Sequence, residues 1–145
     1  MLEDILSNHV LVNAVLGWTL AQVLKTLIHA IVNRGLDIKR LFGDGGMPSG
    51  HSATVTAMAA TAGFEYGLGS TFFAISAILA IVVMHDAMGV RREAGRHAKA
   101  LNELLAAMGD SRISDEEKLK EFLGHTPSQV CVGAILGFLI AFILH

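Results

Sequence analysis

The chain alternates long apolar stretches with polar connections. The first apolar stretch runs from about Val10 to Val32 and the last from Pro127 to Leu144. Each is long enough to cross a hydrocarbon layer of about 30 Å at about 1.5 Å per residue. Two shorter apolar stretches, Ser52 to Tyr66 and Ser70 to His85, flank Gly67-Leu68-Gly69, which predicts a tight helical hairpin.

Composition agrees with a membrane-embedded chain. Hydrophobic residues make up 52% of the chain and charged residues only 17%, against about 25% charged residues in an average soluble domain. Lys25 is the one formal charge between Val10 and Val32, and no charge follows Thr126. The prediction is an all-α integral membrane helical bundle in one domain, residues 1–145, with about four membrane helices plus short polar helices.

Two polar connections, about residues 33–47 and 86–123, separate the apolar stretches. In the second, a helical pattern runs from Ala98 to Met108, and a capping-box pattern at Ser114 opens another short helix to about Phe122. Of the eleven Lys and Arg residues, three lie in the first connection and seven in the second. Basic residues favour the cytoplasmic side, which predicts a cell (inner) membrane protein with both connections in the cytoplasm.

Other features narrow the functional classes. The net charge of −2 gives no support for a nucleic-acid partner. The single Cys131 lies in an apolar stretch, so the chain has no disulfide framework. The N-terminus lacks the basic region of a cleaved signal peptide.

A Gly-Gly-Met-Pro-Ser-Gly-His sequence, residues 45–51, precedes the second apolar stretch. Ser49 suits the cap of a helix that starts here, and Pro48 suits its first turn. The unpaired N–H groups of a helix start favour an anion, and Gly50 lets that anion approach the backbone. His51 adds a group that titrates near neutrality. A capped turn with an incidental histidine is the simpler alternative.

The last apolar stretch begins in the same way. His125 precedes Thr126 and Pro127, and Gln129 completes a Thr-x-x-Gln capping box. Alternating membrane crossings place His51 and His125 at the same membrane face. Two histidines at two helix starts suit phosphoryl transfer, in which one attacks phosphorus and the other protonates the leaving oxygen.

Cations for such a site are available on two segments. Lys25 shares one helical face with Gln22 and His29, which favours the bundle interior, although a lysine near a helix end can also reach the membrane surface. His29 itself is expected to pack on the helix face, and the alternative is that it joins the site. Arg91 and Arg92 follow the fourth apolar stretch, and at most one of them can face a bound phosphate.

Metal binding is the alternative use of two histidines. Only one carboxylate, Asp86, is suitably placed, and the chain lacks the clustered acids or cysteines of a zinc or magnesium site. The prediction is therefore a site without metal or other cofactor.

Several segments together resemble the divergent branch of the type 2 phosphatidic acid phosphatase (PAP2) superfamily, which is related to acid phosphatases and vanadium-dependent haloperoxidases. The resemblance covers nearly the whole chain, and its most specific element is Pro48-Ser49-Gly50-His51. The segments are 21–25, 45–51, 86–92, 101–102 and 124–127, with Val130 and Gly133. The resemblance implies an all-helical fold and a metal-free phosphatase that passes through a phosphohistidine.

The resemblance also implies roles for individual residues. His125 matches the nucleophile of the third motif and His51 the general acid of the second. Ser49 and Gly50 match the part that holds phosphate, and Lys25 matches the lysine of the first motif.

The chain departs from these motifs at three places. The first motif has Arg-Pro where this chain has Val32-Asn33, and the third has an arginine where this chain has Leu119. The third motif also has an Asp four residues after its histidine, where this chain has Gln129. A neutral amide stabilises an imidazolium less well than a carboxylate does. Asp86 or Glu121 is a candidate substitute for the missing acid, and Arg91 or Arg92 for the missing arginines.

The leading hypothesis is a membrane phosphatase that acts on a lipid phosphate such as phosphatidylglycerophosphate or phosphatidic acid. The alternatives are a polyprenyl diphosphate phosphatase, a catalytically weakened relative that binds or carries phosphate-bearing lipids, and a metal-assisted hydrolase that uses Asp86. Self-association into a homo-oligomer would be one way to bury Lys25 and Glu65.

Overall fold

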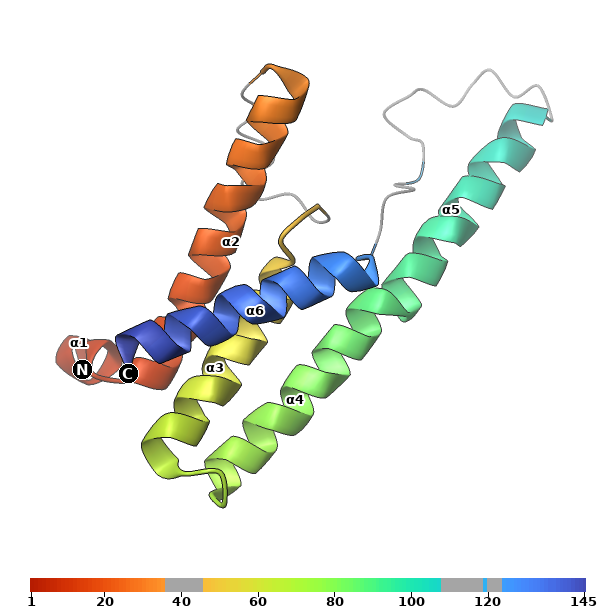
Figure 1. Ribbon diagram of the computed structural model, residues 1–145. Coiled ribbons are helices and arrows are strands. Elements are labelled where there is room, and N and C mark those ends of the chain that lie inside the picture. The colour runs from red at the N-terminus through yellow and green to blue at the C-terminus, as the bar shows by residue number, and fades with distance from the viewer. Residues whose placement is uncertain (36–45, 108–118, 120–123) are drawn as a thin grey trace.

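The computed structural model describes residues 1–35, 46–107, 119 and 124–145, apart from the side chains of Arg91 and Arg92. Within these ranges the chain is helical and contains no strand (Figure 1). The helices are α1 (Leu2–Leu6), α2 (His9–Asn33), α3 (Gly50–Tyr66), α4 (Thr71–Met88), α5 (Val90–Ala107) and α6 (Pro127–Leu144). The all-α fold class predicted from the sequence is confirmed.

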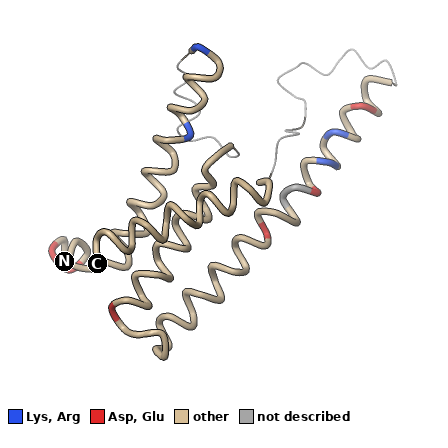
Figure 2. Tube along the Cα trace, in the orientation of Figure 1, with Lys and Arg blue, Asp and Glu red and all other residues tan. Residues whose placement is uncertain are grey.

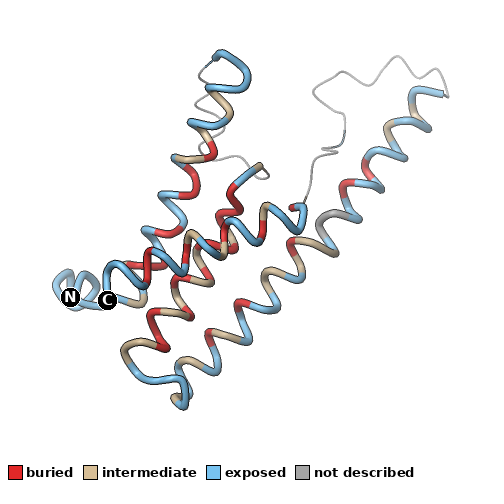
Figure 3. The backbone as a smooth tube through the Cα atoms, in the orientation of Figure 1, coloured by how far each residue is buried: buried red, intermediate tan, exposed pale blue. Residues whose placement is uncertain are grey.

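Helix α3 lies at the centre of the bundle and packs against α2, α4 and α6 (Figure 1). Buried positions follow one another along it, whereas α4 and α6 are mostly exposed on the outside (Figure 3). The buried residues of α3 include Ala53, Ala57, Ala62 and Gly63. Small side chains of this kind let helix backbones approach closely inside a membrane, where close packing contributes much of the association energy.

The outer surface of the bundle is apolar. Ile75 and Ile81 on α4 are 64% and 60% exposed, and Phe142 on α6 is 66% exposed. Large apolar side chains gathered on an outer surface are unfavourable in water and suit contact with lipid.

Among the described residues, three helical stretches are long and apolar enough to cross a membrane: α2, the stretch Thr71–Ala107 that contains α4 and α5, and α6. Helix α3 is shorter, at 17 residues, and is surrounded by the other helices. Of the about four membrane helices predicted from the sequence, three therefore have the length and composition to span a membrane, and the fourth, α3, is a shorter central helix.

The predicted hairpin between α3 and α4 is confirmed. Helix α3 ends at Tyr66, and Gly67 follows with a φ of 82°, a conformation that favours glycine. The Ser70 hydroxyl oxygen accepts the N–H of Phe73 at 3.1 Å and so caps α4.

Helix α5 follows α4 after Gly89 and extends away from the bundle (Figure 1). It begins at Val90, so the helical pattern that was expected from Ala98 starts earlier and joins α4 almost directly. Charged residues follow one another along α5, while α3, α4 and α6 carry few (Figure 2). The short helix expected from Ser114 to Phe122 lies outside the described residues.

The bundle has two distinct polar ends. The site end contains the end of α2, the start of α3, the end of α4 and the start of α6; the far end contains both chain termini and the hairpin (Figure 1). Both polar connections therefore join the bundle at the site end, as the alternation of apolar stretches predicts.

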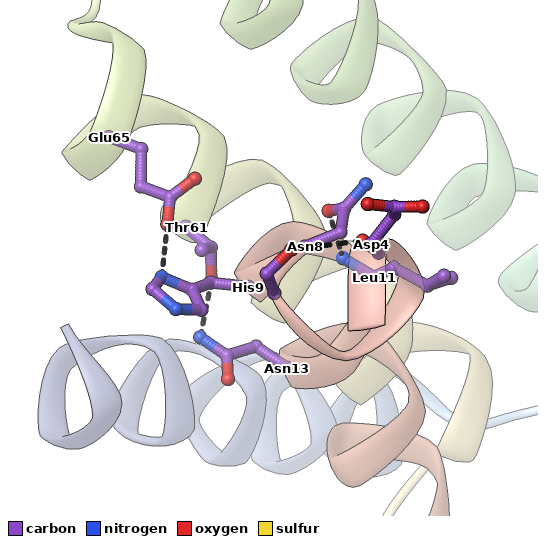
Figure 4. Close-up of polar contacts among 8 residues, drawn as sticks. Asp4, Asn8, His9, Leu11, Asn13, Thr61 and Glu65 are labelled. Atoms are coloured by element: carbon purple, nitrogen blue, oxygen red, sulfur yellow. Dashed lines mark hydrogen bonds and ion pairs between the residues drawn. The ribbon is translucent and has the colours of Figure 1, made fainter. Parts of the chain in front are cut away.

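At the far end, polar side chains of α2 and α3 contact one another (Figure 4). His9 Nδ1 lies 2.6 Å from Glu65 Oε1, and Asn13 Nδ2 donates a hydrogen bond of 3.1 Å to Thr61 Oγ1. The charged or polar residues of the apolar stretches are thus accommodated within one chain. Since Lys25 is also buried within a single chain, neither it nor Glu65 requires a second copy, and homo-oligomer formation stays a prediction.

Candidate functional site

The start of α3 is the centre of the candidate site. Ser49 is fully buried, and its Oγ accepts the backbone N–H of Ser52 at 3.3 Å and the Ser52 hydroxyl at 3.0 Å. The predicted cap is confirmed, although Pro48 precedes the cap and does not occupy the first turn. Gly50 and His51 are the first two helical residues, so they lie at the positive end of the helix dipole, where an anion is favoured.

The start of α6 supplies the second histidine. The predicted capping box is confirmed: Gln129 Oε1 accepts the N–H of Thr126 at 3.1 Å, and Thr126 Oγ1 accepts the N–H of Gln129 at 3.4 Å. His125 directly precedes this cap and is only 4% exposed. Its backbone N–H donates to the carbonyl oxygen of Ala87 at 2.9 Å, which ties the start of α6 to the end of α4.

The two histidines lie beside each other. The ring centroids of His51 and His125 are 5.9 Å apart, and the rings are inclined by 76°. A backbone hydrogen bond of 3.1 Å from the Ser49 N–H to the Gln129 carbonyl oxygen fixes the two helix starts relative to each other. Histidines that are 74 residues apart in the sequence are thereby brought to one place, at two helix starts with positive dipole ends.

Glycines on α6 make this approach possible. A Cβ atom at Gly133 would overlap the carbonyl oxygen of Ser49, and one at Gly137 would overlap the carbonyl oxygen of Ala53. Any side chain at Gly133 would therefore push α6 away from the start of α3. The position of His125 against His51 depends on this close contact.

Helix α2 brings a buried cation to the same end. Lys25 is 5% exposed, and its Nζ donates to Gln22 Oε1 at 2.7 Å. Gln22 Oε1 in turn lies 3.8 Å from the position that a Cβ atom would take at Gly50. The predicted inward orientation of Lys25 is confirmed, and the polar face of α2 lies against the start of α3.

The remaining predicted site residues lie near the α4–α5 junction. Asp86 is half-buried on α4, next to the Ala87 carbonyl that holds the His125 backbone. Arg91 and Arg92 belong to the first turn of α5, but their side chains lie outside the part of the chain that is described.

The departures from the family motifs have structural consequences. The side chain of Gln129 is part of the capping box, so its amide oxygen is directed to the Thr126 N–H. Leu119 exchanges two hydrogen bonds with the Asn102 side chain: its N–H donates to Oδ1 at 3.1 Å, and its carbonyl oxygen accepts from Nδ2 at 2.9 Å. Asn102 therefore connects Leu119 to α5. Glu121 lies outside the described residues.

Two further polar residues of α2 accompany Lys25, as their shared helical face predicts. Gln22 is the hydrogen-bond partner of Lys25, and His29 lines a pocket together with Lys25. The signal for both is the helical spacing from Lys25, which places all three on one face.

Chemically, the site is suited to an anion. Lys25, His51 and His125 can each carry positive charge, and two helix starts point into the same region. Within residues 1–35, 46–107 and 124–145, no three His, Cys, Asp or Glu side chains gather closely enough to share a metal ion.

The fold and the site define an all-helical integral membrane protein with two histidines at adjoining helix starts. The chain belongs to the Divergent PAP2 family, whose family model matches residues 6–140. It is 40% identical over 152 aligned residues to a Bacillus subtilis (strain 168) protein with the name "Uncharacterized membrane protein YuiD". That alignment covers 97% of this chain and 96% of the relative. No solved structure matches the chain.

Proposed function

We propose that this protein is a membrane lipid-phosphate phosphatase that hydrolyses a phosphomonoester through a phosphohistidine intermediate. The observation that carries the proposal is the pairing of His51 with the buried His125, 5.9 Å apart between ring centroids at two helix starts. Two rings this close to each other can both contact one phosphoryl group that is bound at the helix starts.

In the proposed reaction, an imidazole nitrogen of His125 attacks phosphorus, and the bond from phosphorus to the lipid oxygen breaks. His51 gives its proton to that oxygen, so the lipid leaves as an alcohol. Water then attacks the phosphohistidine while His51 takes up a proton, and inorganic phosphate and free His125 are released. Lys25 and the N–H groups at the start of α3 stabilise the charge on the phosphoryl oxygens.

Asp86 is the proposed carboxylate that orients and stabilises the imidazole of His125. It takes the place of the aspartate that this chain lacks at Gln129, since the side chain of Gln129 is engaged in the capping box. Its position beside Ala87, whose carbonyl holds the His125 backbone, supports this assignment. Arg91 or Arg92 is the proposed further phosphate contact.

The proposed location is the cell membrane with the site on the cytoplasmic side. The support is the concentration of basic residues in the two connections that join the bundle at the site end. This location favours substrates made in the cytoplasmic leaflet, such as phosphatidylglycerophosphate and phosphatidic acid. A reporter fused at the second connection checks it, because exposure of that reporter outside the cell would reverse the assignment.

A second candidate is a weakened relative that binds or carries phosphate-bearing lipids without hydrolysing them. The observation that favours it is again Gln129, since an amide held in a helix cap supplies no charge to a neighbouring imidazolium.

Phosphate release from a panel of lipid phosphates by the purified protein separates the two candidates. We expect release that resists a metal chelator and falls about a thousandfold in His125→Ala. Inhibition by the chelator would indicate metal-assisted hydrolysis. Lipid that stays bound in detergent without any release would favour the binding protein.

A further inference from the structure

A pocket lies between α2, α3 and α4, farther along the bundle than the candidate site. Its volume of about 380 Å³ falls in the range of about 300–1,000 Å³ that is usual for ligand pockets. In the described part of the chain, α2 and α4 each pack on α3 but not on each other, so the pocket opens between them (Figure 1). Its lining includes Leu11 and Ala14 of α2, Met58 and Ala62 of α3, and Ile75 and Leu79 of α4.

The lining suits a hydrocarbon chain. Apart from Asn8, Tyr66 and Ser76, the lining residues are apolar. The Ser76 hydroxyl donates to the carbonyl oxygen of Phe72 at 2.7 Å. Asn8 caps α2, where its Oδ1 accepts the N–H of Leu11 at 3.0 Å. Both polar groups thus serve the helices that carry them, and an apolar lining of this kind favours an alkyl chain over a polar ligand.

The pocket lies along the same face of α3 as His51. Met58 follows His51 by seven residues and Ala62 follows by four more, and both spacings return to one face of a helix. At about 1.5 Å per residue, Met58 lies about 10 Å and Tyr66 about 22 Å from His51 along the helix axis. The ring centroids of Tyr66 and Phe72 are 4.9 Å apart, and both residues line the pocket beside the hairpin.

The candidate site determines which chain reaches this pocket first. A lipid phosphate bound at the start of α3 has its chain in the hydrocarbon layer, alongside the helix that begins there. The bound phosphate tethers that chain beside the pocket, which raises its effective concentration there. The chains of surrounding lipids have no such tether, so the chain of the bound lipid phosphate is the favoured occupant.

We propose that this pocket binds the distal part of the hydrocarbon chain of the substrate and that the protein therefore prefers lipid phosphates whose chains reach Met58. The inference rests on the proposed function, because it places the phosphate between His51 and His125. A butyl chain extends at most about 6 Å from its phosphate oxygen, since each bond is about 1.5 Å long, and stops short of the pocket. A hexadecyl chain is long enough to enter it.

Photochemical labelling locates the chain without any need for turnover. The probe is hexadecyl phosphate with a photoreactive diazirine near the end of its chain, added to the purified protein in detergent micelles. We expect the label on Met58, Ile75 or Leu79, and about tenfold less label from a hexadecanol probe that carries the same diazirine but no phosphate. Label concentrated on Phe73 and Phe138, which line a pocket between α3, α4 and α6, would overturn the inference.

Two substitutions on α4 measure what the pocket contributes to affinity. Ile75→Trp narrows the pocket and should weaken binding of hexadecyl phosphate about tenfold, as the loss of about five well-packed carbon atoms allows. Binding of butyl phosphate should stay within about twofold, which also shows that the variant is folded. Ile78→Trp is the matched control, because Ile78 is 63% exposed against 64% for Ile75 and does not line this pocket. It should leave the affinity for both phosphates within about twofold.

Leu79→Trp narrows the same pocket from the next turn of α4 and should repeat the loss, which keeps the test valid if Ile75→Trp does not fold. Equal affinity for hexadecyl phosphate in Ile75→Trp and Ile78→Trp would overturn the inference, as would equal labelling by the probes with and without phosphate. Phosphate release from the same samples distinguishes this result from a failure of the proposed function. Phosphate-dependent labelling of the pocket without release supports the pocket and contradicts hydrolysis. Release with the label elsewhere supports hydrolysis and contradicts the pocket.

Discussion

The two ends of the bundle are both polar, but their polar residues are arranged differently. At the far end, complementary polar groups face each other across α2 and α3, as His9 with Glu65 and Asn13 with Thr61 (Figure 4). At the site end, groups of the same kind gather: Lys25, His51 and His125 are all able to carry positive charge, and they lie near two helix starts.

The polar residues of the two ends therefore serve different purposes inside a membrane. Complementary pairs at the far end satisfy each other and connect two helices, which is a structural use. Groups that can carry positive charge and gather at two helix starts favour a bound anion, which is typical of a binding site. Changes at the site end should therefore affect activity more than stability, and changes at the far end should do the reverse.

The largest expected effect comes from a histidine at the site end. His51→Ala removes the proposed general acid and should lower phosphate release about a thousandfold, within the usual contribution of general acid catalysis. His9→Ala removes a histidine at the far end and should keep the rate within about twofold. The measurement is phosphate release from the best lipid substrate, compared for His51→Ala and His9→Ala at matched protein amounts. Equal losses in the two variants would contradict a division of roles between the ends.

The next effect concerns the close contact that brings the helix starts together. Gly133→Ala introduces a Cβ atom that overlaps the Ser49 carbonyl oxygen, so it should destabilise the fold by about 1–3 kcal/mol. Gly69→Ala is the control, because a Cβ atom there meets nothing within 4 Å. Thermal unfolding in detergent gives both values. Similar unfolding temperatures for the two variants would show that α6 does not pack on Ser49 in this way.

Short-range sequence patterns predict the helix caps of this protein. The Thr126–Gln129 capping box and the Ser49 cap could be assigned because the groups that form them are three residues apart. The meeting of His51 with His125 followed from topology, since both histidines precede apolar helices that start at the same end.

Other contacts depend on tertiary packing and leave no local signal. The alanines of α3 would equally suit a helix that faces lipid, and the central place of α3 is shown by its buried positions and by the close approach of Gly133 and Gly137 of α6. The pairing of His9 with Glu65 joins residues that are 56 positions apart, so no helical periodicity could predict it.

A smaller effect is expected from the buried polar pair at the far end. Thr61→Val removes the hydrogen-bond acceptor of Asn13, whose amide is only 3% exposed, and should cost about 1–2 kcal/mol of stability. Thr19→Val is the matched control, because the Thr19 hydroxyl bonds to the Val15 carbonyl within its own exposed helix face. The free energy of unfolding in detergent should fall only in Thr61→Val, with phosphate release within about twofold in both. A large loss of release in Thr61→Val would show that the far end also supports the site.

The smallest effect is expected at the pair of His9 and Glu65, one helical turn away from the Asn13–Thr61 hydrogen bond. Glu65→Gln keeps the shape of the side chain and removes its charge beside His9; the side chain of His9 is 63% exposed and that of Glu65 is 21% exposed. Pairs open to solvent contribute little because water and salt screen them, so the loss of stability should stay below about 1 kcal/mol and shrink further as salt is added. Unfolding of Glu65→Gln and of the unmodified protein at low and high salt measures this difference. A salt-independent loss above about 2 kcal/mol would instead place this pair in a shielded environment and make it, with Asn13 and Thr61, part of the structural core of the far end.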